Sequence, residues 1–432
     1  MEGGRLLPLL LWAAPLIVVA RPCSESDIYP GYPLPKDREF GSVRPYPSLM
    51  DCSQLDLANV RLKADEALLL SRAVGRRING EFRNISVLDG IKSIVLDGVE
   101  EAGDAVVAEL AAGLTRSPPH PHNVTLALAS AGITSVGAAE LASLLSAAGS
   151  TVVSLRMDWN TGIGDAGASA IGRALVGNRA LRMLGLERCG IADAGVIQLA
   201  TSLATAPTAA AHAATVAASG TAVAASVAAQ TAMAASSVRE LYLEGNRIGA
   251  AGSESLGYAL RSSKVERLGL ALNPIGPLGA RHLADALRRN GHLVTLDLAF
   301  CEIGDDGAEA LGVALRSNTR LRELRLQGNG IGTRGAAALA DALRINPVAL
   351  RSLNLRLNEL DEPAAQGLLG AARDALASSY AAQHRGTAAG AGLESLRLEH
   401  NHRLAPSAGA AIPQPIRPET LAAIDAEIHV KQ

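Results

Sequence analysis

Hydrophobic residues along the chain follow a repeated segment. Within each repeat their spacing changes from alternate positions to helical spacing. Each unit begins with leucines at alternate positions, as in residues 241–243 (LYL), which is the spacing of a strand with one buried face. After a glycine-containing turn, apolar residues continue at helical spacing, as at Leu283, Ala284 and Leu287. One unit is therefore predicted to contain a strand, a turn and a helix.

The unit is repeated along the chain at a nearly constant distance. Its four clearest copies occupy residues 238–260, 265–287, 293–315 and 321–343. A single copy cannot cover its own apolar face, so the copies are expected to stack. The leading strand positions are Leu126, Leu155, Leu184, Leu241, Leu268, Leu296, Leu324 and Leu353, with degraded copies near Leu55, Ile94 and Leu396.

Stacking of such units determines the fold class. Strands of successive copies pair side by side in parallel, and the helices cover the other side of the sheet. Because a helical layer is wider than a strand layer, the stack is expected to bend into an arc. The pattern therefore predicts an α/β fold, a right-handed solenoid shaped like a horseshoe, with a curved parallel sheet on the concave face and helices on the convex face.

A polar or thiol residue follows each strand at a fixed position, three residues after the last leucine-type position. A buried side chain at this point can satisfy backbone groups of the neighbouring coil, which would otherwise lose their partners where the strand leaves the sheet. We predict a structural ladder here. Its members are Asn160, Cys189, Asn246, Asn273, Cys301, Asn329, Asn358 and Asn401.

One copy contains a literal G-x-G-x-x-G, formed by Gly162, Gly164 and Gly167 directly after a strand-like run. This is the spelling of a dinucleotide-binding loop. The last two glycines recur in other copies, for example as Gly304 and Gly307, so we interpret them as residues that turn the chain and start each helix. The sequence also lacks a P-loop and a nucleophile elbow, so no cofactor is expected.

The repeated pattern L-x-x-L-x-L-x-x-[NC]-x-[IL]-G-x-x-G-A resembles the ribonuclease-inhibitor-like class of leucine-rich repeat. The resemblance is strong over residues 124–375 and extends over 51–404 with the degraded ends, about 11 repeats. Relatives in this class include ribonuclease inhibitor, the sensor domains of NOD-like receptors and the Ran GTPase-activating proteins, which are usually intracellular. The resemblance implies a surface that binds a protein ligand, and no enzyme activity.

Two insertions interrupt the repeat region at 51–404. Residues 204–236 are rich in alanine and contain no Asp, Glu, Lys or Arg. Ala, Ser and Thr carry too little hydrophobicity to hold a segment in lipid, so we interpret this stretch as a low-complexity insertion and expect no stable membrane span. A partner-binding helix is the alternative. A second insertion covers residues 378–392, ahead of the last copy.

The two ends of the chain differ from the repeats. Residues 1–20 join Arg5 to an apolar run and read as a signal peptide; the alternatives are an uncleaved membrane anchor and a misannotated start. Residues 21–50 form a leader or N-terminal cap rich in Pro and Tyr. Residues 405–432 form a Pro-containing C-terminal cap or tail. These features predict a secreted or lumenal protein, with a cytoplasmic location as the alternative.

Four further residues bear on the compartment. Asn84 and Asn123 begin Asn-x-Ser/Thr sequons that could carry glycans in a secreted chain. Cys23 and Cys52 flank the start of the regular region and could form a disulfide. We predict glycosylation at both asparagines and a disulfide between these two cysteines.

Composition and charge narrow the possible partners. The formal net charge is −2, and no stretch concentrates Lys and Arg, so nucleic acid is not expected to bind. The pairs His120/His122 and His400/His402 have metal-compatible spacing but no clear third ligand, so no metal is expected. The partner is predicted to be a protein, and the chain is expected to be a monomer.

Binding is expected on the concave face, where the residues between the strand leucines line up from copy to copy. Aromatic and Arg residues on a rigid face are the usual carriers of binding energy. The candidate binding residues are Arg156, Asp158, Trp159, Tyr242, Glu244, Asp297, Phe300, Arg325 and Arg356. The leading hypothesis is a recognition or scaffold module without catalysis, and the alternative is an intracellular GTPase-activating or NOD-like regulator.

Overall fold

The computed structural model describes the repeat region with gaps, and the chain forms two compact units, Met1–Cys189 and Gly190–Gln432. The predicted signal peptide, leader, tail, Cys23–Cys52 disulfide and Asn84 sequon lie outside the described residues. So does most of the alanine-rich insertion. The described residues are 54–56, 93–98, 103–115, 123–204, 236–347, 349–384 and 393–401.

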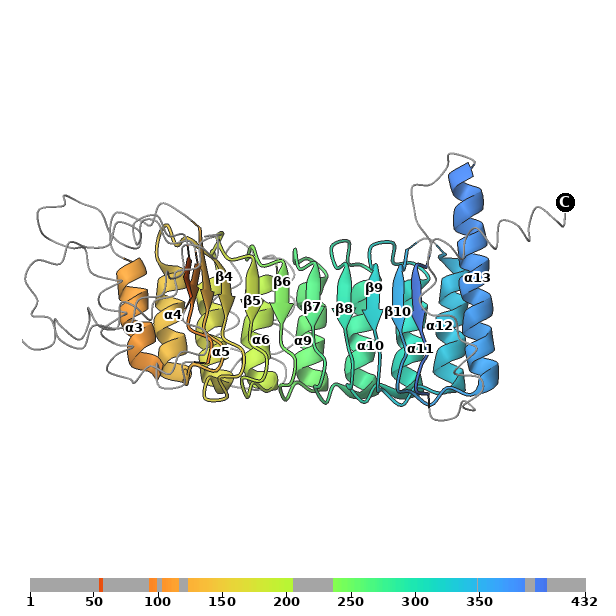
Figure 1. Cartoon of the computed structure of the whole chain (residues 1–432), viewed down its shortest axis with the longest axis horizontal. Coiled ribbons are helices and arrows are strands. Elements are labelled where there is room, and N and C mark those ends of the chain that lie inside the picture. The colour runs from red at the N-terminus through yellow and green to blue at the C-terminus, as the bar shows by residue number, and fades with distance from the viewer. Residues whose placement is uncertain are drawn as a thin grey trace, which may run out of the picture. The chain divides into compact units, whose positions relative to one another are not determined.

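Unit 1 contains five described strands, each parallel to the next, and three helices that pack side by side (Figure 1). The strand leucines are in register, with Leu126 opposite Leu155 and Leu155 opposite Leu184. The elements are β1 (Gln54–Asp56), β2 (Ser93–Val95), α3 (Gly103–Leu114), β3 (Val124–Ala127), α4 (Ser135–Ser146), β4 (Val152–Arg156), α5 (Gly164–Leu175) and β5 (Met183–Gly185).

Unit 2 repeats the arrangement with six described strands and six helices. The elements are α6 (Asp193–Leu203), β6 (Glu240–Tyr242), α9 (Ala250–Leu260), β7 (Arg267–Gly269), α10 (Gly276–Leu287), β8 (Thr295–Asp297), α11 (Gly304–Leu315), β9 (Glu323–Arg325), α12 (Thr333–Ile345), β10 (Ser352–Asn354), α13 (Glu362–His384) and β11 (Ser395–Arg397). The last helix extends into the predicted insertion at 378–392.

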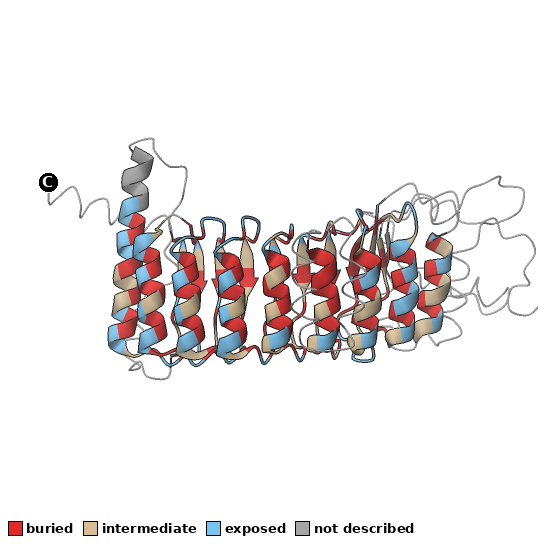
Figure 2. Cartoon of the chain, turned by 180° about the vertical axis from the view of Figure 1, so that it is seen from behind, coloured by how far each residue is buried: buried red, intermediate tan, exposed pale blue. Residues whose placement is uncertain are grey.

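The core of each unit lies between the sheet and the helices. Strand leucines such as Leu296 and Leu298 are fully buried, and so are helix residues such as Ala308 and Leu311. Figure 2 shows the corresponding stripe of buried residues along the helices, beside exposed ones. The prediction of an α/β solenoid, with a parallel sheet on one face and helices on the other, is therefore confirmed.

The residues of the predicted ladder bind backbone groups of the adjacent coils. Nδ2 of Asn329 donates to the carbonyl of Leu298 at 2.7 Å and to that of Leu326 at 3.0 Å, and its Oδ1 accepts from the N–H of Cys301 at 2.8 Å. Cys301 occupies the same position one coil earlier, and its thiol donates to the carbonyl of Leu270 at 3.2 Å. One side chain therefore supplies hydrogen bonds to several backbone groups that have no partner where the chain leaves the sheet.

A second asparagine ladder, which the sequence analysis missed, joins the loops between helices and strands. Nδ2 of Asn318 donates to the carbonyls of Leu287 at 2.6 Å and Asn290 at 3.2 Å, and its Oδ1 accepts from the N–H of Leu321 at 2.8 Å. Each member lies three residues after the last helix leucine, so the repeat spacing could have revealed it. The members are Asn178, Asn290, Asn318 and Asn346.

Aspartates in the first turns of some helices form a third connection. Oδ1 of Asp305 accepts from the N–H groups of Gly332 at 2.7 Å and Gly335 at 2.9 Å in the next coil. A Cβ on Gly335 would lie 2.8 Å from this oxygen, so the close approach requires glycine. The first turn glycine differs between coils: Gly304 has φ +61°, whereas Gly332 is extended at φ −105°.

We predict that Asn329→Ala lowers the free energy of unfolding by about 1–3 kcal/mol, because buried backbone groups of two coils lose their partners. Chemical denaturation of the full chain measures the change. The matched control is Asn354→Ala, since the Asn354 amide bonds the Gln327 side chain and the N–H of Arg356 on a half-buried surface where water can replace it. Equal losses for the two variants would contradict the ladder's role.

Gly304→Ala is predicted to destabilise the chain by about 1–2 kcal/mol, because alanine is strained in the left-handed conformation. No atom lies within 4 Å of a Cβ added to Gly304, so the effect isolates the backbone. Gly332→Ala is the control: its φ is ordinary and its new Cβ would lie 3.4 Å from Asp305. Matched thermal melts should therefore separate the two variants, and similar melting temperatures would count against the assignment.

Candidate protein-binding face

The strand residues between the leucines point away from the core and form a face on each unit. Among the predicted binding residues, Arg156 and Arg325 are exposed, while Tyr242 and Asp297 are half-buried. Tyr242 donates its hydroxyl proton to Glu240 at 3.0 Å, and burial together with this contact raises its pKa to about 12. Its ring is therefore held in place as a neutral phenol.

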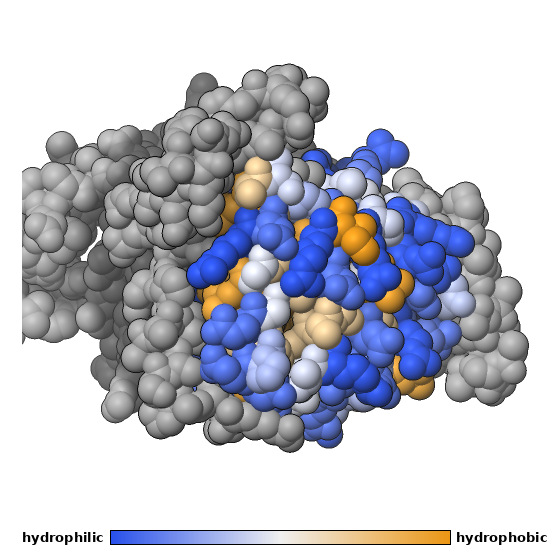
Figure 3. All heavy atoms as spheres, turned by 90° about the vertical axis from the view of Figure 1, so that its right-hand side faces the viewer, coloured by the Kyte–Doolittle hydropathy of each residue, from blue (hydrophilic) through white to orange (hydrophobic). Residues whose placement is uncertain are grey.

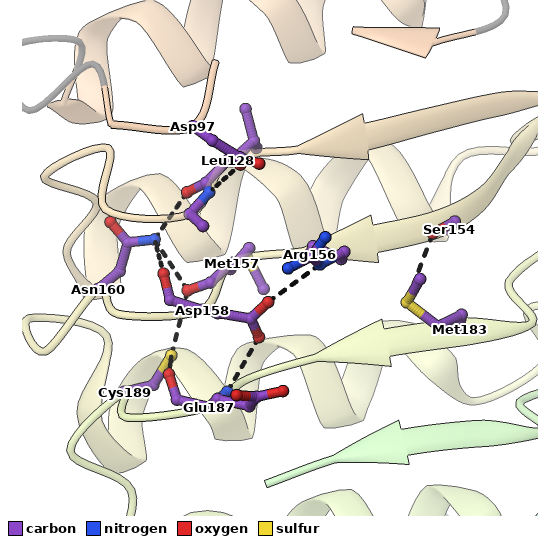
Figure 4. Close-up of polar contacts among 11 residues, drawn as sticks. Asp97, Leu128, Ser154, Arg156, Met157, Asp158, Asn160, Met183, Glu187 and Cys189 are labelled. Atoms are coloured by element: carbon purple, nitrogen blue, oxygen red, sulfur yellow. Dashed lines mark hydrogen bonds and ion pairs between the residues drawn. The ribbon is translucent and has the colours of Figure 1, made fainter. Parts of the chain in front are cut away.

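Asp158 is placed inside the face of unit 1 rather than on its surface. Its side chain is only 3% exposed and accepts from Arg156 Nε and the N–H of Glu187, both at 3.1 Å (Figure 4). It lies over Gly185, where a Cβ would approach Oδ1 to 2.6 Å. Burial, and then the nearby Asp158 charge, raises the pKa of Glu187. Asp158 therefore orients its neighbours and offers little contact area.

Glu244 of unit 2 repeats this arrangement, since its carboxylate lies over Gly269 where a Cβ would collide with it. The space over Gly185 and Gly269, which have no side chains, is therefore filled by acidic side chains of the preceding coil. Sequence reasoning selected both acids but did not connect them with the glycines. The sequence signal is an acid in one coil and, in the next coil, a glycine two residues before the position equivalent to that acid.

Ion pairs balance most of the other charges on the face of unit 2. Arg325 contacts Asp297 at 3.1 Å and Glu323 at 2.8 Å. Arg356 lies 3.4 Å from Glu399. Such partly exposed pairs contribute at most about 1 kcal/mol each to the stability of the fold. The acids therefore position and neutralise these arginines, while the fold depends little on the pairs.

From β2 onward, the residue two positions after the last leucine-type position of each strand has a left-handed backbone, and we name this set the strand-end row. Its backbone N–H donates to the next coil, as Phe300 does to the carbonyl of Gln327 at 2.8 Å. The fold therefore imposes a positive φ whatever the side chain. In unit 1 the row contains Gly98, Ser130, Trp159 and Arg188, and in unit 2 it contains Gly245, Leu272, Phe300, Gly328, Leu357 and His400.

Bulky apolar residues in the strand-end row are both strained and exposed. Glycine adopts this conformation freely, but another residue costs about 1–2 kcal/mol. Four large apolar side chains nevertheless occupy the row, with exposures of 54% for Trp159, 46% for Leu272, 43% for Phe300 and 39% for Leu357. They are half of the eight large hydrophobic side chains exposed among the described residues, so exposure is concentrated at one repeat position.

Two aromatic residues of the row are supported from the side. The Phe300 ring lies over Gly328, where a Cβ would collide with it. The Arg188 guanidinium lies 4.4 Å from the centre of the Trp159 ring. Sequence reasoning found Trp159 and Phe300 because they are aromatic, and it overlooked the leucines at the same offset in two other coils.

The described residues also carry few signs of metal or thiol chemistry. Within them, no group of three or more His, Cys, Asp or Glu side chains could hold a metal ion. Burial raises the pKa of Cys189 and of Cys301 to about 12, so both thiols stay protonated and unreactive near neutral pH. No described helix is long and apolar enough to cross a bilayer.

Comparison with known proteins agrees with the architecture. The Leucine Rich repeat family matches residues 150–172, 289–312 and 317–340. Together with the parallel sheet and alternating helices, these matches make the fold an α/β leucine-rich repeat solenoid. No curated protein matches the sequence.

Several solved structures are similar to the chain at low identity. The actin-binding site 2 of leiomodin-1 is 20% identical, with 31% of this chain and 78% of that one covered and a TM-score of 0.27. The TLR13–ssRNA13 complex is 16% identical, with 74% of this chain and 35% of that one covered and a TM-score of 0.40. The yeast Rad7–Elc1 complex is 12% identical, with 73% of this chain and 78% of that one covered and a TM-score of 0.33. These similarities are too distant to bear on partner or activity.

Proposed function

We propose that the chain is a non-enzymatic recognition module that binds a protein ligand on the strand-bearing face of its leucine-rich repeats. The strand-end row carries this proposal. Its bulky apolar residues cost backbone strain and gain little burial, so folding does not account for them. Large rigid apolar side chains at the edge of a regular face are the usual anchors of a protein interface.

Charged residues of the face suit the same role. The pairs made by Arg325 and Arg356 are partly exposed, so a partner can rearrange them at small cost. By contrast, on the side of the chain where α13 lies in Figure 1, hydrophilic residues predominate and apolar ones form small separate patches (Figure 3).

The test is the triple variant Leu272→Gly/Phe300→Gly/Leu357→Gly in the full chain. We expect partner binding to be lost while the free energy of unfolding changes by about 1 kcal/mol or less, because relief of backbone strain offsets the lost contacts. Quantitative affinity capture with cross-linking measures the first quantity, and chemical denaturation measures the second.

The matched control removes three apolar residues that are equally exposed on the helices, as Leu278→Ala/Val313→Ala/Ile345→Ala. This control should bind the same proteins as the wild type. If both triple variants capture an unchanged set, the strand-end row is not the binding surface. If the glycine variant unfolds early, the row serves stability.

A secreted or lumenal location is part of the proposal, and it is supported by the Asn123-Val124-Thr125 sequon, whose asparagine is exposed. We expect the full chain, expressed in secretory-competent cells, to show a glycosidase-sensitive mass shift that disappears in Asn84→Gln/Asn123→Gln. Unshifted protein retained in the cytosol would rule this location out.

A further inference from the structure

Loops that join the helices of unit 2 to the following strands carry an excess of positive charge, and we name them the basic edge. They are residues 261–266, 288–294 and 316–322. The asparagine ladder at Asn290 and Asn318 bonds the three loops to one another's coils, so they lie side by side. The cations of the basic edge are Arg261, Lys264, Arg288, Arg289, Arg316, Arg320 and Arg322, and its one carboxylate is Glu266.

Helix electrostatics explain only part of this charge. Arg261, Arg288 and Arg316 are the C-cap residues of α9, α10 and α11, where a cation stabilises the negative end of the helix dipole. Lys264, Arg289 and Arg320 lie beyond the caps and are exposed. Their charge is therefore not required by the helices.

The cations of the basic edge also have no negative partner within the part of the chain that the structure describes. Glu266 is bound by Arg239, from the preceding coil. Arg322 donates to the carbonyl of Ala349, and burial together with the charges of Arg351 and Arg320 lowers its pKa. The positive charges of Arg320, Arg322 and Arg351 therefore lie close enough to repel one another.

We propose that the basic edge of unit 2 binds an acidic, helical segment of a partner protein. Carboxylates at i, i+4 and i+7 lie along one face of a helix, so one line of acids can face the cations of successive coils. This surface is distinct from the strand-end row and does not depend on it.

A protein segment fits this edge better than a nucleic acid does. The three loops contain no Trp, Tyr or Phe on which a base could stack. The chain as a whole has a formal charge of −2, which repels a long polyanion at distances beyond the local patch. A short acidic helix senses mainly the local positive charge.

The experiment uses the full chain and a labelled synthetic Ala–Glu peptide with Glu at i, i+4 and i+7 positions. Fluorescence anisotropy should show binding that weakens as salt is raised. The variant Lys264→Gln/Arg289→Gln/Arg320→Gln should bind about tenfold more weakly, as expected for three lost surface pairs. Its melting temperature should stay close to that of the wild type, because none of the three residues caps a helix.

A charge-matched control removes three exposed arginines elsewhere in unit 2, as Arg281→Gln/Arg334→Gln/Arg373→Gln. It should bind the peptide within about twofold of the wild type. Equal weakening of both variants, or no peptide binding at low salt, would overturn the proposal. It would equally fail if an RNA homopolymer or phosphatidylserine vesicles bound as tightly as the peptide and with the same dependence on the variants.

Discussion

Hydrogen bonding between coils is the constraint on which the rest of the structure depends. Most strands are only three residues long, so the sheet pairs few backbone groups in each coil. The chain must then leave the sheet, turn and return with its peptide groups satisfied inside a narrow core. Asparagine side chains at both ends of the coil, and aspartates at some helix starts, provide these partners.

That constraint also separates recognition from stability. Because the N–H groups of Trp159, Leu272, Phe300 and Leu357 are committed to the next coil, each backbone is fixed in the left-handed region and each side chain is directed out of the core. Glycine at Gly245 and Gly328 meets this condition without strain, whereas Leu272, Phe300 and Leu357 meet it at a cost. A side chain that is costly to the fold and exposed to solvent is free to evolve for a partner.

Much of the architecture could be predicted from repeat spacing, because each coil must meet the same packing problem. The alternation around Leu296 and the offset of Asn329 locate a buried strand and its ladder residue directly. Conformations that depend on a neighbouring coil could not be found in this way. Gly304 and Gly332 look equivalent in sequence, yet Asp305 holds the second in an extended conformation and no aspartate does so for the first.

The candidate site was harder to predict for the same reason. Alternation assigns a residue to a face but does not show how its neighbours fill the space around it. Asp158 belongs to the face, yet Gly185 in the next coil leaves room for its carboxylate to turn inward and become buried. Leu357 has no aromatic ring to mark it, and only its backbone angle and exposure place it in the strand-end row.

Charge on unit 2 follows the direction of its helices, and this direction makes its two edges chemically different. Helix N-termini favour acids such as Asp305, and helix C-termini favour cations such as Arg316. Because α9, α10 and α12 have no acid in the first turn, the contrast comes mainly from the cations at the C-terminal ends. Residues beyond the caps, such as Lys264 and Arg320, increase the contrast where the helices no longer require it. The described part of unit 2 therefore carries exposed apolar side chains along its strand ends and positive charge at the C-terminal ends of α9, α10 and α11.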